Sequence, residues 1–64
     1  MSDNIVRARQ LTVPEQILTS GGVETGEPGE WIIQDAEGRR YLSSNMQFTL
    51  FWEETDIKGV YKEK

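Results

Sequence analysis

Cysteine and histidine are both absent from this chain of 64 residues. Disulfide bonds are therefore excluded, and a zinc site would lack the thiolate and imidazole ligands that zinc usually takes. The same two absences remove the groups that most often act as nucleophile or activating base, and the three lysines lie in a charged segment at residues 58–64. We predict a protein that is not an enzyme, and we expect no catalytic residues, no metal site and no cofactor.

Basic residues and long apolar runs are also scarce. Eleven acidic against seven basic residues give a formal net charge of −4, which has the same sign as a nucleic-acid backbone. Nucleic acid is therefore a poor candidate for the partner. No run approaches the roughly 20 apolar residues that a membrane-spanning helix needs, and the first residues contain no secretory signal pattern. We expect a soluble cytoplasmic protein with no membrane partner.

The supply of core residues is small. A domain of this size buries only about 60 % of the surface that its unfolded chain exposes. Six residues of the chain are aromatic, and we expect homo-oligomerisation to add to the surface they bury. Four of the six are predicted to form the core: Trp31, Tyr41, Phe48 and Trp52.

Residues 28–42 predict a β-hairpin. The turn dipeptide Pro28-Gly29 leads into the aromatic and β-branched run 31–33, which favours a strand. The next turn, residues 35–38, has Asp at its start and Gly at the position that needs a positive φ. The chain then returns as a second strand at residues 39–42.

The first part of the chain predicts further strands. Residues 5–11 alternate in polarity, with Val6 and Ala8 as the inward pair. Residues 13–20 allow either a short helix or a strand that turns into residues 23–25. We favour the strand, because five of the six glycines lie between residues 21 and 38 and such a density suits tight turns.

Residues 44–52 are ambiguous between helix and strand. Ser44 and Gln47 have the spacing of a capping box, and a helix would place Phe48, Phe51 and Trp52 on one face. A strand would instead point Met46, Phe48, Leu50 and Trp52 to one side, and Gln47, Thr49 and Glu53 to the other. We predict a single helical turn at residues 44–47 followed by a strand.

The prediction for the whole chain is one small β-domain at residues 5–56. We expect an all-β fold with one short helical turn, as a small SH3-like barrel or a strongly twisted antiparallel meander of four to six short strands. Residues 1–4 are predicted to be a disordered N-terminus, and residues 57–64 an edge strand or a frayed tail.

About half of the chain resembles a family of small proteins encoded by bacteriophages and prophages. Members show Thr-x-x-Gly, then Pro-Gly-Asp-Trp/Tyr-Ile, Gly-x-x-Tyr and Phe-x-x-x-Tyr-Glu. The matching residues here are Thr19, Gly22, residues 28–33, Gly38, Tyr41, Phe48 and Trp52-Glu53. The chain departs from the pattern at Glu30, Asn45 and Trp52, where the family usually has Asp, Pro and Tyr, and it lacks an N-terminal helical segment that many members carry. The resemblance implies a phage or prophage origin, the cytoplasm of a host cell, a strand at residues 16–25 and no assigned activity.

Phe51 is the first candidate for a functional site. On the predicted strand it points outward between Thr49 and Glu53, and an exposed phenylalanine on a polar face indicates a protein interface. The corresponding hypothesis is a non-enzymatic phage-type protein that docks on a host or phage protein, in host takeover or counter-defence.

Arginines near aromatic residues give a second candidate. Arg7 and Arg9 share a face of their strand, and Arg39, Arg40 and Tyr41 follow the central turn. Charge combined with stacking is how nucleotide phosphates and single-stranded nucleic acids are bound. The alternative hypothesis is an oligomer that sequesters a nucleotide-like anion through Arg39, Arg40 and Tyr41, and a third is nucleic-acid binding or mimicry.

Overall fold

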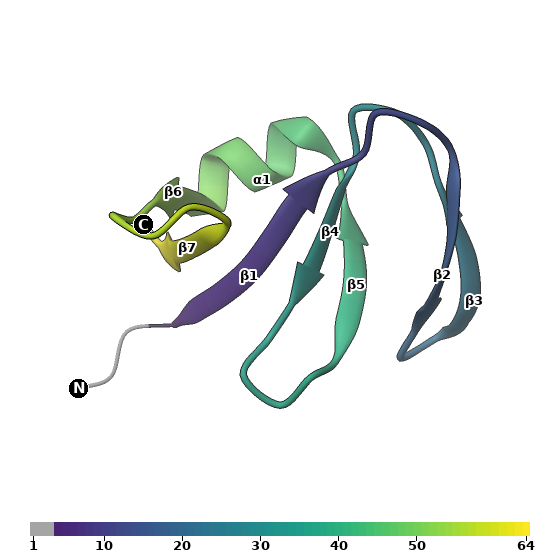
Figure 1. Cartoon of the computed structure of the whole chain (residues 1–64), viewed down its shortest axis with the longest axis horizontal. Helices are drawn as coiled ribbons and strands as arrows, with labels where there is room; N and C mark the ends of the chain where they lie inside the picture. The colour runs from purple at the N-terminus through teal and green to yellow at the C-terminus, as the bar shows by residue number, and fades with distance from the viewer. Residues whose placement is uncertain (1–3) are drawn as a thin grey trace.

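The computed structural model describes residues 4–64, which form seven β-strands and one short helix (Figure 1). In chain order these are β1 (Ile5–Gln10), β2 (Glu15–Thr19), β3 (Gly22–Gly26), β4 (Trp31–Gln34), β5 (Arg40–Ser43), α1 (Asn45–Phe51), β6 (Trp52–Glu54) and β7 (Val60–Glu63).

Five of the strands form one antiparallel sheet, in the order β5-β4-β1-β7-β6, and β2 and β3 pair as a separate hairpin. Figure 1 shows α1 on one side of the five-stranded sheet and the β2–β3 hairpin on the other. The all-β prediction with a short helical element is confirmed. The two sheets do not close into a barrel, so the structure is the twisted antiparallel form, with seven strands rather than four to six.

The predicted hairpin at residues 28–42 is confirmed as β4 paired with β5. Gly29 and Gly38 have φ angles of +93° and +86°, which only glycine adopts without strain. In the second turn, Asp35 Oδ1 accepts hydrogen bonds from the backbone N–H groups of Glu37 and Arg39, at 3.0 and 2.9 Å. An aspartate at the start of the turn therefore fixes its shape.

The strand alternative for residues 13–25 is also confirmed, because β2 and β3 pair through a tight turn after Thr19. The Thr19 side chain is buried, and its hydroxyl accepts a hydrogen bond from the N–H of Gly21 at 3.1 Å. The same hydroxyl lies 2.6 Å from the Glu24 carboxylate, to which it can donate. This bonding satisfies a buried polar group within the hairpin itself.

The prediction for residues 44–52 is wrong in its second half. Ser44 Oγ accepts from the N–H of Gln47 at 3.2 Å, as a capping residue does, but the helix continues to Phe51 and the strand begins only at Trp52. The physical reason is tertiary packing: from the inner face of the helix, Phe48 is 2 % exposed in the core cluster with Val6 and Ile33.

The segment 57–64 is neither an edge strand nor a frayed tail. Its strand β7 pairs with β1 on one side and β6 on the other, so it is an inner strand. Lys64 donates its backbone N–H to the carbonyl of Phe51 at 2.9 Å and its ammonium to the carbonyl of Thr49, which caps the C-terminal end of α1. Of the predicted disordered segment, residues 1–3 lie outside the described residues, and Asn4 is hydrogen-bonded to Glu63 at 2.6 Å.

The core consists of two clusters on opposite faces of the five-stranded sheet, because the adjacent residues Ile32 and Ile33 point to opposite sides of β4. The cluster under α1 is formed by Val6, Ile33 and Phe48, and the cluster under the hairpin by Leu11, Ile17 and Ile32. The inward placement of Val6 is confirmed, and Ala8 packs against the same cluster.

The four predicted core aromatics have different environments. Phe48 is buried, and Trp31 and Trp52 are half-buried against it. Tyr41 is 37 % exposed, and Tyr61 packs in its place. The two faces of the sheet are therefore covered by different elements, α1 on one face and the β2–β3 hairpin on the other.

Candidate functional site

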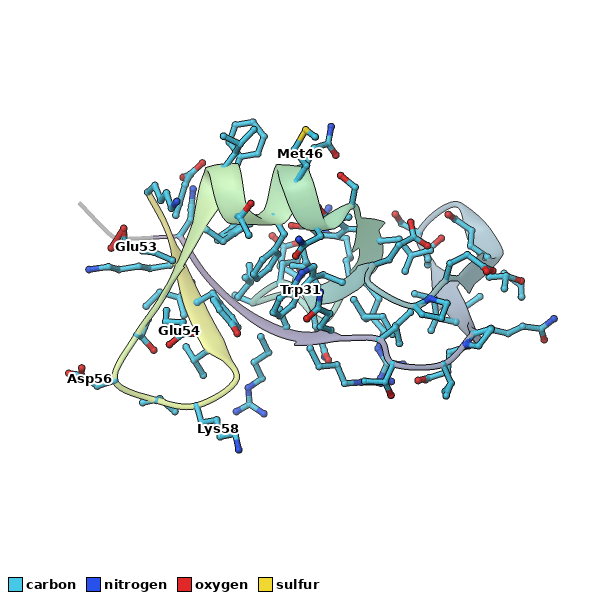
Figure 2. All side chains as sticks on the ribbon, turned by 90° about the horizontal axis from the view of Figure 1, so that it is seen from above. Trp31, Met46, Glu53, Glu54, Asp56 and Lys58 are labelled. Carbon is cyan, nitrogen blue, oxygen red and sulfur yellow. The ribbon has the colours of Figure 1, made fainter. Side chains whose placement is uncertain are left out.

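The outer face of α1 carries three large apolar side chains, Met46, Leu50 and Phe51, which we call the α1 ridge. They are 73 %, 62 % and 56 % exposed. Phe48 occupies the inner face, and Figure 2 shows Met46 on the side of α1 that points away from the strands. Met46 and Leu50 are four residues apart, so their side chains are neighbours along one line of the helix.

The α1 ridge belongs to a helix without charge. All seven residues from Asn45 to Phe51 are uncharged, whereas 28 % of the whole chain is charged. After Trp52 come the acidic residues Glu53 and Glu54, and Glu53 forms an ion pair with the ammonium of Lys62 at 3.5 Å. The ridge is thus an apolar strip with acidic residues at one end.

The three predicted interface residues do not form one face. Phe51 is exposed as predicted, but Thr49 lies two residues away, about 200° around the helix. The Thr49 hydroxyl hydrogen-bonds to the carbonyls of Asn45 and Met46, both at 3.0 Å. Together with Glu53 it lines a hollow between α1 and β6, away from Phe51.

Met46 and Leu50 were missed as surface residues because the strand interpretation turned them inward. The signal that could have found them is the capping box at Ser44, since a helix started there places residues four apart on one face.

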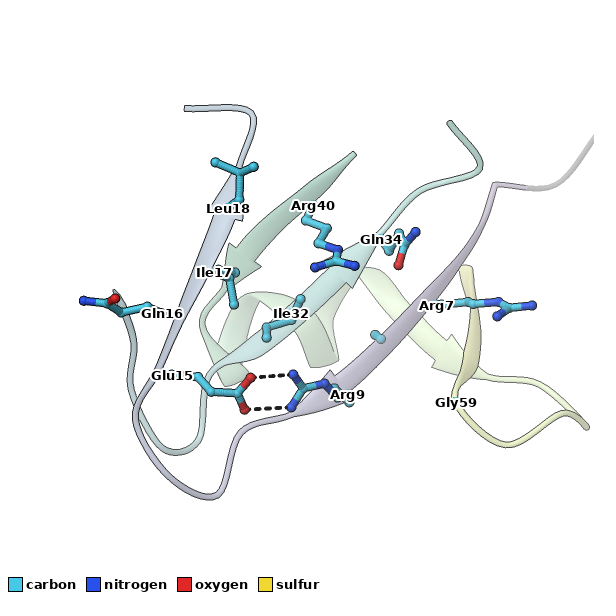
Figure 3. A pocket seen from close by; sticks show the side chains of 11 residues that line it. Arg7, Arg9, Glu15, Gln16, Ile17, Leu18, Ile32, Gln34, Arg40 and Gly59 are labelled. Carbon is cyan, nitrogen blue, oxygen red and sulfur yellow. Dashed lines mark hydrogen bonds and ion pairs between the residues drawn. The ribbon is translucent and has the colours of Figure 1, made fainter. Parts of the chain in front are cut away.

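A second candidate site is a groove of about 360 Å³ between β2 and the five-stranded sheet (Figure 3). The hydrophobic cluster of Ile17 and Ile32 forms part of its lining. Its charged and amide side chains include Arg7, Arg9, Glu15, Gln34 and Arg40.

The register of the sheet aligns three of these polar residues. Arg7 of β1 is paired with Gln34 of β4, and Gln34 is paired with Arg40 of β5. Directly paired residues of antiparallel strands lie on the same face. We call this alignment the Arg7–Gln34–Arg40 row, and it crosses the sheet beneath the hairpin.

Arg9 is held by an ion pair across the groove. Its guanidinium donates two hydrogen bonds to the Glu15 carboxylate, at 2.6 and 2.9 Å (Figure 3). This bonding lowers the pKa of the Glu15 carboxyl and raises the pKa of Arg9, although partial desolvation opposes both changes. Within residues 4–64, Arg7 and Arg40 have no such ion-pair partner.

The structure separates the predicted ligand-binding residues. Arg39 is paired with Asp35 at 3.0 Å and with Glu37 at 3.3 Å, in the turn before β5. Arg40 and Tyr41 are consecutive in β5, so they point to opposite faces of the sheet. Burial and the nearby charge of Asp35 raise the pKa of Tyr41, whereas Arg40 lines the groove.

Comparisons of the chain with protein-family models, with curated proteins and with solved structures found no match. Among residues 4–64, no helix has the length and apolar character needed to cross a membrane. The same part of the chain has no group of three or more acidic side chains that could hold a metal ion. The candidate sites of the described residues are therefore the α1 ridge and the groove beneath the β2–β3 hairpin.

Proposed function

We propose that this chain is a non-enzymatic interaction domain of the phage or prophage type, which acts by docking its α1 ridge on a host or phage protein. The observation that carries the proposal is the concentration of Met46, Leu50 and Phe51 on the outer face of an uncharged helix. Met46 and Leu50 have the i, i+4 spacing of the anchors through which amphipathic helices bind grooves in partner proteins, and Phe51 adds apolar surface beside Leu50.

Burial of these side chains supplies the driving force. Each large apolar side chain that is moved from water to an apolar contact contributes about 1.5–3 kcal/mol. Within residues 4–64, nine large apolar residues are exposed and six are buried. A domain with so small a core gains stability from a partner that binds only its folded form.

Charge indicates the chemistry of the partner. The chain has a net charge of −4, and Glu53 and Glu54 follow Phe51 after one intervening residue, Trp52. We expect a partner with an apolar groove and a basic rim. The apolar groove of such a partner would bind the α1 ridge, and basic residues at the rim of the groove would face the acidic residues of this chain. Complementary charge speeds association and disfavours other partners. A second copy of the chain would instead bring its own acidic residues against the acidic residues of the first copy.

The test is binding by a purified partner. Proteins captured from a host lysate by the immobilised chain are purified and titrated with wild type, Leu50→Lys and Leu18→Lys. Lysine is a good helix former and is favourable near a helix C-terminus, so Leu50→Lys should keep the fold. Leu18 is a matched control, because it is 68 % exposed but lies on the hairpin.

We expect Leu50→Lys to weaken binding at least about tenfold, as for a residue near the centre of an interface. Leu18→Lys should bind like wild type. Equal binding by Leu50→Lys, or a loss with Leu18→Lys, would contradict the proposal. Light scattering that shows a dimer abolished by Leu50→Lys would assign the ridge to a second copy and overturn docking on another protein.

A further inference from the structure

We propose that the groove beneath the β2–β3 hairpin binds a small phosphorylated ligand with an apolar or planar part, of the size of a mononucleotide. In this site Arg40 and Arg7 supply the positive charge and Gln34 a neutral hydrogen-bond donor. The site is separate from the α1 ridge, because the hairpin and α1 cover opposite faces of the sheet.

The charge of the groove is opposite to that of the chain. Its lining contains three arginines and one glutamate, a formal charge of +2, in a protein of net charge −4. Two of the four arginines in the chain, Arg9 and Arg39, are neutralised by carboxylates of the fold. The other two, Arg7 and Arg40, are the ends of the Arg7–Gln34–Arg40 row.

The two arginines at the ends of the row have no acidic partner in the described part of the fold. Arg7 and Arg40 have like charges on one face, and no carboxylate of residues 4–64 forms an ion pair with either. Among the described residues, both are therefore free to bind an anion, and guanidinium groups bind phosphate oxygens through paired N–H donors. The half-buried Gln34 lies between them, and its side chain makes no hydrogen bond within residues 4–64.

Figure 3 shows the Arg40 side chain pointing toward Ile32, whereas the Arg7 guanidinium points away from both residues. Arg40 is therefore the main anchor, and Arg7 is the second charge at the rim. A ligand held by Arg40 would also meet Ile17 and Ile32, which face each other from the hairpin and the sheet. These contacts suit a base or another apolar group beside the phosphate.

Size favours a small ligand over a polynucleotide. A volume of about 360 Å³ is at the low end of the range for small-molecule sites. A longer phosphate chain would leave the groove and meet a surface of predominantly acidic charge. The bidentate Arg9–Glu15 pair joins β1 to β2, so it holds the hairpin at the distance that defines the groove.

The test uses AMP, inorganic pyrophosphate and a thymine oligonucleotide as probes, titrated calorimetrically into the full chain. We expect AMP to bind one per chain, to raise the melting temperature and to bind more tightly than pyrophosphate. Arg40→Gln should weaken AMP binding at least about tenfold, as expected for loss of a charge-assisted contact. Arg7→Gln should weaken it less, and the matched control Arg39→Gln should bind like wild type.

Circular dichroism confirms the fold of each variant before titration. The absence of binding by both AMP and pyrophosphate at millimolar concentration would overturn the proposal, and so would an equal loss with Arg39→Gln. Tighter binding of the oligonucleotide than of AMP would assign the arginines to nucleic acid instead. Leu50→Lys should leave AMP binding unchanged, so this site and the docking function succeed or fail independently.

Discussion

The indole ring of Trp31 stacks on the phenyl ring of Phe48, with centroids 3.9 Å apart and ring planes 6° from parallel. The edge of Tyr61 meets both rings, at centroid distances of 5.5 and 4.8 Å. The indole N–H of Trp31 also donates to Asn45 Oδ1 at 3.0 Å. These contacts join the central hairpin to the first residue and the middle of the short helix, and they orient the α1 ridge away from the sheet.

Replacement of Phe48 by leucine should therefore loosen α1. Leucine keeps an apolar side chain in the core but loses the aromatic pairing, which is worth about 0.5–1.5 kcal/mol per pair beyond area burial. We expect a loss of about 1–3 kcal/mol in the free energy of unfolding, measured by urea denaturation followed by tryptophan fluorescence. Phe51→Leu, at the exposed end of the same helix, should change it by less than about 0.5 kcal/mol. Equal effects of the two substitutions would show that the stack does not hold the helix.

Gly26 is required by packing rather than by its backbone conformation. A Cβ atom at this position would lie 2.5 Å from Leu11 Cδ1 and 2.9 Å from Leu42 Cδ2, and its φ is not positive. Leu11 is buried and cannot move away freely. We expect Gly26→Ala to cost about 1–3 kcal/mol of folding free energy in chemical denaturation. Gly21→Ala, whose Cβ would meet atoms no closer than 3.4 Å, is the control; a neutral Gly26→Ala would refute the close packing.

The Asp35 turn should make stability depend on pH. Partial burial opposes ionisation of Asp35, but hydrogen bonds from Arg39 and Glu37 outweigh it and lower the pKa of the carboxyl below its usual value. A lowered folded-state pKa means that the stabilisation is complete above the unfolded-state pKa, near about 4, and is lost as the pH falls through the folded-state pKa. Thermal melts should show Asp35→Asn to be less stable than wild type at pH 7, with a difference that shrinks in acid. A difference independent of pH would contradict the role of the charge.

The turns were predictable from the sequence because their residues carry local constraints. Gly29, Gly38 and Asp35 mark turn positions whatever the rest of the chain does, and the structure has them at those positions. The helix at Asn45–Phe51 was not predictable in this way, because two signals compete in one segment. The alternation of large apolar residues favours a strand, and the capping box favours a helix. The contact that decides between them, Phe48 on Trp31, is tertiary.

The groove could not be predicted from the sequence, for a different reason. Arg7, Gln34 and Arg40 are far apart in the chain, and only the register of β1, β4 and β5 brings them into one row. The proximity of Arg39, Arg40 and Tyr41 in sequence suggested a shared site. Alternation along β5 places Arg40 and Tyr41 on opposite faces instead.

The most direct test of the docking function is site-specific photo-crosslinking in host cells. A photoreactive phenylalanine analogue is placed at Met46 in one variant and at Val23 in the other, since both residues are well exposed but lie on opposite sides of the sheet. We expect Met46 to yield an adduct with one partner protein and Val23 to yield none with that protein. An adduct formed equally from both positions, an adduct from Val23 alone, or an adduct with a second copy of the chain would contradict docking of the α1 ridge on another protein.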